Sequence, residues 1–312
     1  MVQENLHTIL GGGGAIGLFL RDELTARNLP VRIVRRNTII PGAHVEMIAA
    51  DLSVPRQVRE AVAGSSVVYL VAGLPYNHRV WRNLWPVIMR NTIDACRETS
   101  ARLVFFDNVY MYGRVTGPMT EQTPFNPCSR KGEVRARIAT MLLEEIRAAN
   151  LTALIARSAD FYGKGAENSI PHRLVFARMA DGKPAFLLAA DDLKHSYTYT
   201  PDASRALVML ATDDAAWNQT WHLPTAHHPP TGKDFVTMAA REFGFPPRYR
   251  ILKHHLLALA GLINPVIREI PEMLYQNESD YIFDSTKFEK AYRFAPTAYT
   301  EGICRTAQMY RR

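Results

Sequence analysis

Three glycines near the start of the chain have the spacing of a phosphate-binding turn. Gly11, Gly14 and Gly17 follow a short apolar run and lead into an amphipathic stretch. A turn this tight needs positive φ angles, which glycine adopts without strain, and it lets the backbone come close to an anion. The free N–H groups of a helix that begins here also attract negative charge. The pattern predicts a dinucleotide site whose contacts are Gly11, Gly13, Gly14, Ala15, Ile16 and Gly17.

Two arginines end the second apolar run of the chain. Arg35 and Arg36 stand where an acid is typical of sites that bind an unphosphorylated adenosine ribose. A guanidinium group instead matches a 2′-phosphate by charge and by its fork of donors. We therefore expect NADP(H) to be preferred over NAD(H), although two solvated surface arginines would give the same pattern. Asp51 and Leu52 follow the third run; Asp51 is expected to contact adenine or to cap the next helix.

The elements that must position these groups alternate regularly. Short apolar runs are typical of strands covered on both faces, and the stretches between them have helical periodicity. Strand–helix alternation predicts an α/β fold with a Rossmann-type doubly wound parallel sheet. The predicted strands are 8–10, 31–34, 45–48, 67–72, 103–106 and 154–156, and the clearest helices are 15–27 and 131–149.

The rhythm changes after about residue 165, where prolines become frequent. We expect a dinucleotide-binding domain over 1–165, to which 196–223 returns. The segments 166–195 and 224–312 are expected to form a smaller mixed substrate lobe over the carboxyl ends of the strands, where open α/β sheets bind ligands.

Composition narrows the classes of protein. The 312 residues include 37 Lys+Arg and 30 Asp+Glu, a net charge of +7, which suits a solvated basic surface or an anionic ligand. Cationic runs never exceed two residues, so nucleic acid is not expected. Cys96, Cys128 and Cys304 lack metal or disulfide spacing, which favours the reducing cytoplasm. The most apolar stretch, 256–267, is expected to be a buried or interface helix rather than a membrane contact.

Several segments, in order, carry a family resemblance. Besides the glycine loop they are 67–73, 104–113, 157–163, 194–203 and 279–294. With them the chain resembles the extended short-chain dehydrogenase/reductase superfamily, in its NAD(P)-dependent epimerase/dehydratase group, over nearly its whole length. The resemblance implies hydride transfer with a nicotinamide cofactor. It also implies that Val71, Ala72, Gly73 and Ser158 lie beside that cofactor.

The expected catalytic residues depart from the family pattern. The family has a Tyr and a Lys four residues apart and a Ser or Thr at the end of the fifth strand. Here Lys131 matches the lysine, Pro127 replaces the tyrosine and Asn108 replaces the hydroxyl residue. Asn108 can still hydrogen-bond a carbonyl oxygen, and Lys131 can still bind ribose. What is missing is the group that moves the proton.

Four candidates stand in for that group. Lys131 is the first choice, since it matches a residue that atypical members retain; the alternative is a solvated lysine at the start of a helix. Tyr110 or Tyr112 follows the fifth strand, although core packing suits Tyr112 better. Cys128 has cationic neighbours that favour a thiolate, and Asp107 would need desolvation; an inert thiol and a backbone cap are the simpler interpretations.

The histidines are weaker candidates for contacting the substrate or binding a metal ion. His195 stands where the family often has a substrate-facing arginine. The pairs 227–228 and 254–255 lack acid or cysteine partners at metal spacing, so no metal is expected. Arg157 and Tyr162 are expected to pack at the end of the sixth strand.

The sequence therefore favours an NADP-dependent oxidoreductase, epimerase or dehydratase acting on a small carbonyl, hydroxyl or sugar-type substrate. The alternative is an NADP(H)-binding sensor or regulator without turnover. The expected partner is a small molecule, for which an anion is one candidate, with neither nucleic acid nor membrane as partner. A homodimer through the helix at 83–96 is a further expectation. The substrate pocket is expected to be lined by 74–82, 110–115, 158–165, the surroundings of His172, and 195–199.

Overall fold

A seven-stranded sheet organises the first part of the protein. The computed structural model describes residues 5–37, 45–264 and 267–310. The strand order is β10-β6-β5-β4-β1-β2-β3, and the pairs from β3 through β6 are parallel. This is the predicted Rossmann-type architecture. The strands are β1 (His7–Leu10), β2 (Val31–Arg35), β3 (Val45–Ala49), β4 (Val67–Leu70), β5 (Arg102–Asp107), β6 (Ala153–Arg157) and β10 (Thr220–His222).

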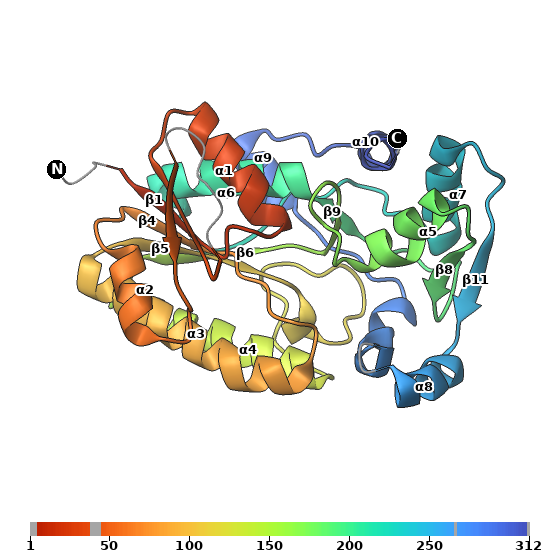
Figure 1. Ribbon diagram of the computed structural model, residues 1–312, viewed down its shortest axis with the longest axis horizontal. Coiled ribbons are helices and arrows are strands. Elements are labelled where there is room, and N and C mark those ends of the chain that lie inside the picture. The colour runs from red at the N-terminus through yellow and green to blue at the C-terminus, as the bar shows by residue number, and fades with distance from the viewer. Residues whose placement is uncertain (1–4, 38–44, 265–266, 311–312) are drawn as a thin grey trace. The chain divides into compact units, whose positions relative to one another are not determined.

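Helices cover both faces of this sheet. Figure 1 shows α1 (Ala15–Ala26) and α6 (Thr200–Thr212) on one face. On the other face lie α2 (Pro55–Val62), α3 (His78–Thr99) and α4 (Arg130–Arg147). Because both faces are covered, every residue of β1, β4 and β6 is buried, which explains why most of their residues are apolar. The predicted stripe Ile16, Leu20 and Leu24 of α1 is buried as well.

The chain divides into two compact units. The first comprises the described residues of Met1–Asn108, Glu133–Arg157 and Ala203–Trp221, and the second those of Val109–Gly132, Ser158–Asp202 and His222–Arg312. Thus 109–132 and 158–165 group with the second unit, whereas 203–221 groups with the sheet. The functional division expected at 165 stays a prediction.

The second unit contains two short parallel strand pairs. In one, β7 (Asp160–Tyr162) pairs with β9 (Tyr197–Tyr199); in the other, β8 (Ala185–Leu188) pairs with β11 (Tyr249–Leu252). The helices are α5 (Ala177–Ala180), α7 (Gly232–Phe243), α8 (His254–Ile263), α9 (Thr286–Tyr292) and α10 (Tyr299–Gln308). Short 3-10 turns occupy Tyr110–Tyr112, Ile267–Glu269 and Pro271–Asn277, with a further one at Asp214–Ala216 in the first unit, and a π-helical turn spans His172–Phe176.

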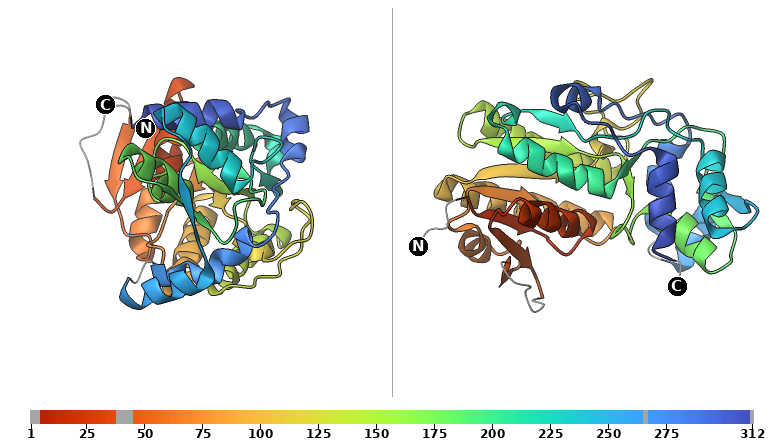
Figure 2. Two further views of the ribbon diagram at one scale, coloured as in Figure 1. Left: turned by 90° about the vertical axis from the view of Figure 1, so that its right-hand side faces the viewer. Right: turned by 90° about the horizontal axis from the view of Figure 1, so that it is seen from above.

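An aromatic core holds the second unit together. Tyr162, Phe176 and Phe235 are fully buried in one apolar cluster, where their rings meet edge to face. In Figure 2, α7 lies beside α10, which supplies Ile303 to the same cluster. Tyr162 is therefore a packing residue, but its ring partners are Tyr199, Phe235 and Tyr299 of the second unit rather than the end of the sixth strand.

The apolar stretch at 256–267 forms α8, while 265–266 lie outside the described residues. Among the described residues, no helix combines the length and apolar character that crossing a membrane requires.

Candidate functional site

The glycine loop, residues 11–14, packs so closely against neighbouring backbone that a side chain at Gly11 would clash. Gly11 has φ +92°, and its N–H donates to Val34 O at 2.9 Å. A Cβ built on Gly11 would lie 2.3 Å from Ala72 Cα. The loop therefore touches the chain that leaves β4. In the order β4-β1-β2 the connections diverge between β1 and β4, and the carboxyl ends at such a switch point form the ligand crevice of open α/β sheets.

The helix that follows starts against this loop. Gly14 is the N-cap of α1 and makes no side-chain cap, so the N–H groups of the first turn depend on another partner. A Cβ on Gly17 would lie 2.6 Å from Gly12 Cα. The close approach of Gly17 to the loop brings the positive end of α1 to the turn, which is the geometry that binds phosphate.

One of the two arginines lies against the loop. A Cβ on Gly13 would stand 3.5 Å from Arg35 Cζ, so that guanidinium group adjoins the glycine turn. Arg36 is exposed, and its charge helps to lower the pKa of Asp51. Of the two, Arg35 is therefore placed to reach a group bound at the loop.

The carboxylate of Asp51 accepts hydrogen bonds from a neighbouring residue of the same turn. Its Oδ1 accepts from Ser53 N at 2.8 Å and from Ser53 Oγ at 2.7 Å, and these bonds are the main reason its pKa is lowered. The N-cap of α2 is Val54, so Asp51 does not cap that helix. Leu52 O accepts from Asn91 Nδ2 at 3.0 Å, which ties this turn to α3.

Asp107 belongs to a buried charge cluster. Arg135 Nε donates to Asp107 Oδ1 at 2.7 Å, and Arg157 Nε lies 3.6 Å from Oδ2. All three side chains are at most 4 % exposed. The guanidinium group of Arg135 also lies 4.6 Å from the ring centre of Trp85. Asp107 thus fixes the ends of β5 and β6, while the N–H of Asn108 donates to its Oδ1 at 2.8 Å.

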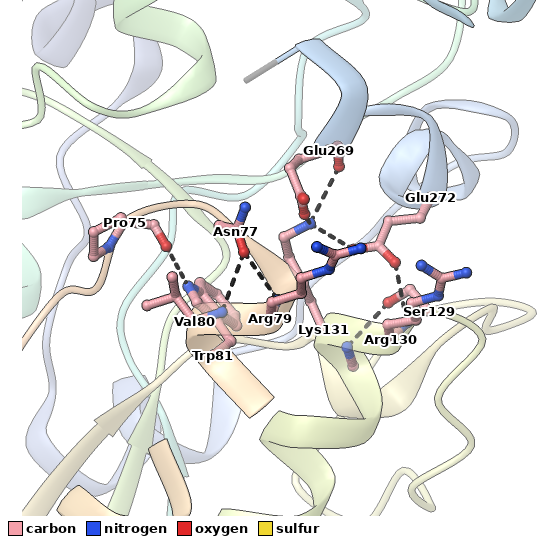
Figure 3. A network of polar contacts seen from close by, with 11 residues as sticks. Pro75, Asn77, Arg79, Val80, Trp81, Ser129, Arg130, Lys131, Glu269 and Glu272 are labelled. Atoms are coloured by element: carbon pink, nitrogen blue, oxygen red, sulfur yellow. Dashed lines mark hydrogen bonds and ion pairs between the residues drawn. The ribbon is translucent and has the colours of Figure 1, made fainter. Parts of the chain in front are cut away.

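Lys131 is buried in a second charge cluster (Figure 3). Its side chain is 0 % exposed, and Nζ lies 2.6 Å from Glu269 Oε2 and 2.5 Å from Glu272 Oε1. Glu269 O accepts a third bond at 3.2 Å. Three acceptors match the three donors of an ammonium group. The sequence predicts a lysine that binds a ligand, whereas here it binds two acids.

Nothing in the local sequence could have identified those acids. Glu269 lies 138 residues and Glu272 lies 141 residues from Lys131 along the chain. The side chain of Glu272 is 22 % exposed, while that of Glu269 is 5 % exposed. Glu272 also accepts from the backbone N–H of Arg130 at 3.2 Å, so it holds the first turn of α4 as well as the ammonium group.

The residues in and near the 3-10 turn at Tyr110–Tyr112 differ in burial and in their partners. Tyr112 is buried, and its hydroxyl lies 2.8 Å from His222 Nε2, which agrees with core packing. Tyr110 is half-buried at the start of the turn. Partial burial raises the pKa of Cys128, against the opposing charge of Arg114. This direction favours the neutral thiol, and so the simpler interpretation of Cys128 as an inert cysteine.

His195 is buried between two acceptors. Its Nε2 lies 3.1 Å from Asp160 Oδ2, and its Nδ1 lies 3.2 Å from Gln276 O. Together with Tyr197, it lines a cavity of about 40 Å³. Ser158 is also buried, and its hydroxyl donates to Ala159 O at 2.6 Å.

The other histidines lie apart from any metal centre. His227 pairs with Glu289 at 2.6 Å, and His254 and His255 are exposed. Throughout the part of the chain that the structure describes, no group of three or more His, Cys, Asp and Glu side chains is arranged to hold a metal ion.

Comparisons with known proteins point to one family. The model of the NAD dependent epimerase/dehydratase family matches residues 7–222. No curated protein matches the chain. Among solved structures, it is similar to the UDP-glucose 4-epimerase of Thermus thermophilus in complex with NAD. The TM-score is 0.80, the identity is 18 %, and the match covers 98 % of this chain and 99 % of that one.

Two further structures have the same degree of similarity. One is the dTDP-glucose 4,6-dehydratase of Streptomyces venezuelae with NAD, with a TM-score of 0.80, 16 % identity and coverage of 98 % and 97 % of the two chains. The other is the UDP-glucuronic acid 4-epimerase of Bacillus cereus with UDP-glucuronic acid and NAD, with a TM-score of 0.80, 15 % identity and coverage of 98 % of each chain. At these identities the likeness establishes a shared fold.

Proposed function

The chain belongs to the NAD dependent epimerase/dehydratase family, and we propose on this basis that it is an NADP(H)-dependent oxidoreductase, epimerase or dehydratase. The observation that carries the proposal is the glycine loop, where a Cβ at Gly11 or Gly17 would meet neighbouring backbone at 2.3 or 2.6 Å. Backbone packed this closely, at the N-terminus of a helix, is suited to a pyrophosphate.

The preference for the phosphorylated cofactor rests on Arg35. Its guanidinium group adjoins Gly13 in the loop, and a planar fork of donors binds a 2′-phosphate well. Arg36 is the weaker candidate for the phosphate ligand.

The proposed substrate is a small carbonyl, hydroxyl or sugar-type molecule. The structural relatives are enzymes of UDP-glucose, dTDP-glucose and UDP-glucuronic acid, so nucleotide sugars are the first class to test. A bound nicotinamide supplies hydride transfer. Asn108 is the proposed donor to the reacting oxygen, and Tyr110 a second polar contact.

Lys131 is proposed to move the proton in place of the family tyrosine. Its Nζ lies 2.5 Å from Glu272 Oε1, and that carboxyl is partly exposed. Glu272 therefore links the buried ammonium group to solvent, and a proton released by Lys131 can be replaced along that contact.

A second function is favoured by the same cluster. The three acceptors around Lys131 match all its donors, and Pro127 offers no titratable group. In this second proposal the protein binds the cofactor without turnover and acts as a sensor or regulator.

Two measurements separate these functions. NADPH and NADH binding are measured by calorimetry, and absorbance is then followed with NADPH and a panel of aldehydes, ketones and nucleotide sugars. The proposal predicts tighter binding of NADPH and turnover of at least one panel member. Binding without turnover supports the sensor, and absence of binding to either nucleotide overturns both functions.

A further inference from the structure

Helix α8 (His254–Ile263) carries the most exposed large hydrophobic side chains among the residues that the structure describes. Leu256 is 46 % exposed and Leu259 is 63 % exposed. Leu262 and Ile263 reach 80 % and 90 %. Scattered single apolar residues on a surface are ordinary, but four within one short helix form a patch that marks an interaction site.

The orientation of α8 is fixed by its opposite face. Leu257 is 3 % exposed and packs in a cluster with Leu188 and Leu274. A Cβ on Gly261 would lie 2.9 Å from Arg268 Cα, so the helix and the following turn are in close contact. With 3.6 residues per turn, Leu257 and Gly261 share a face opposite the four exposed side chains. The exposed face is thus turned away from the core that holds the helix.

The segment that contains α8 carries one sign of charge, and the acids that follow it, Glu269 and Glu272, pair with Lys131. No Asp or Glu occurs from Phe243 through Arg268. Exposed cationic and histidine side chains precede and follow the apolar patch on the chain: Arg248, Arg250, Lys253, His254, His255 and Arg268. An exposed apolar patch beside acid-free basic sequence is complementary to a surface that is apolar inside and negatively charged outside.

We propose that α8 docks the protein on the surface of an anionic lipid bilayer. A helix of ten residues is about 15 Å long, half the roughly 30 Å of the hydrocarbon core, so it lies in the interface rather than across it. The leucines enter the acyl boundary, and the exposed Lys253, His254 and His255 at the start of the helix meet the headgroups. A second copy is a poorer occupant, because self-association would bring two basic acid-free segments together.

This inference departs from the sequence expectation. The sequence predicts that the apolar stretch at 256–267 is a buried or interface helix, without a membrane partner. The structure buries Leu257 and Gly261 but leaves the side chains of Leu256, Leu259, Leu262 and Ile263 exposed. This exposed face favours contact with a membrane surface over a fully buried helix.

The test is sedimentation of the full chain with vesicles. Phosphatidylcholine vesicles are compared with vesicles that also contain about 30 % phosphatidylglycerol. The expected result is binding to the anionic vesicles at least about tenfold stronger than to the neutral ones, weakened by high salt. Equal affinity for both vesicles, or no sedimentation with either, overturns the proposal without bearing on cofactor binding.

A matched pair of variants assigns the effect to α8. The double variant Leu259→Glu/Leu262→Glu is expected to reduce binding at least about tenfold, since it places charge in the acyl boundary. Met309→Glu is the control, because Met309 is 41 % exposed and directly follows α10, away from α8 in the sequence, and it is expected to bind like wild type. Retained binding in the double variant overturns the proposal. Analytical ultracentrifugation tests the other occupant, a second copy of the chain. A wild-type protein that dimerises but does not bind vesicles, together with a double variant that is monomeric, would also overturn the proposal.

Discussion

At the scale of single residues, the burial of Lys131 depends on two acids. Its ammonium group is enclosed by Glu269 and Glu272. A buried ammonium group needs opposite charge nearby, since desolvation of an unpaired ion is costly. The acids thus make the burial of Lys131 possible, whatever its part in turnover.

Removal of Lys131 therefore tests how strongly this cluster supports the fold. Lys131→Met leaves two largely buried carboxylates without a cation, and we expect the free energy of unfolding to fall by about 3–5 kcal/mol. Lys183→Met is the matched control, because its pair with Asp181 is exposed, and we expect a change of less than about 1 kcal/mol. Urea unfolding measures both. Equal losses in the two variants would contradict a special role for the buried cluster.

Arg35 carries the predicted choice of cofactor. We expect Arg35→Ala to weaken NADPH binding by roughly tenfold to a hundredfold, because a charged hydrogen-bonding partner of the phosphate is lost. NADH binding should change little. Calorimetry with both nucleotides measures the effect, and Arg36→Ala is the control with the smaller expected loss. If Arg36→Ala has the larger effect, the assignment of the phosphate ligand is reversed.

At the scale of elements, the close contact between α1 and the glycine loop is the critical one. The helix can begin beside the loop only because Gly17 has no side chain; a Cβ there would meet Gly12 backbone at 2.6 Å. Backbone on both sides leaves no flexible side chain to yield. The position of the helix N-terminus, and with it the anion site, depends on this glycine.

We expect Gly17→Ala to move α1 away from the loop, at a cost of about 1–3 kcal/mol in stability from overpacking. Dinucleotide binding should weaken with it, because the N–H groups no longer converge on the pyrophosphate. Gly14→Ala is the control for stability, since φ is −92° and the nearest atom to its Cβ is 3.9 Å away. Thermal unfolding and calorimetry follow the two effects. A fully stable Gly17→Ala variant would refute the packing argument.

At the scale of the whole molecule, a buried histidine couples stability to pH. His7 hydrogen-bonds Tyr69 at 2.9 Å inside the sheet, and burial, aided by Arg102, lowers its pKa to about 4. The folded protein therefore keeps His7 neutral at a pH where the unfolded chain takes up a proton. This contribution to stability is complete above about pH 6.5 and is lost as pH falls toward 4.

The variant His7→Gln removes that proton linkage. Between pH 7.5 and 5, we expect the free energy of unfolding of wild type to fall by about 2 kcal/mol more than that of the variant. Urea unfolding of both proteins at the two pH values gives the difference. Parallel losses in wild type and variant would show that other groups control the acid response.

The parallel sheet, the glycine loop and the family could all be predicted from the order of the residues. Each of these signals is local: a strand, a turn and a helix within about 30 residues impose their own spacing and need few distant partners. The short strands β7, β8, β9, β10 and β11 escaped prediction, because runs of three or four residues without clear periodicity resemble loops.

Only the tertiary structure decided which partners the charged and apolar side chains have. Glu269 and Glu272 reach Lys131 across more than 130 residues, and Arg135 reaches Asp107 from another element. The face of α8 that is buried was equally a matter of what packs beneath it. Which side chains are buried and which ions pair depends on how the whole chain packs. The spacing of residues in the sequence indicates only the local structure around them.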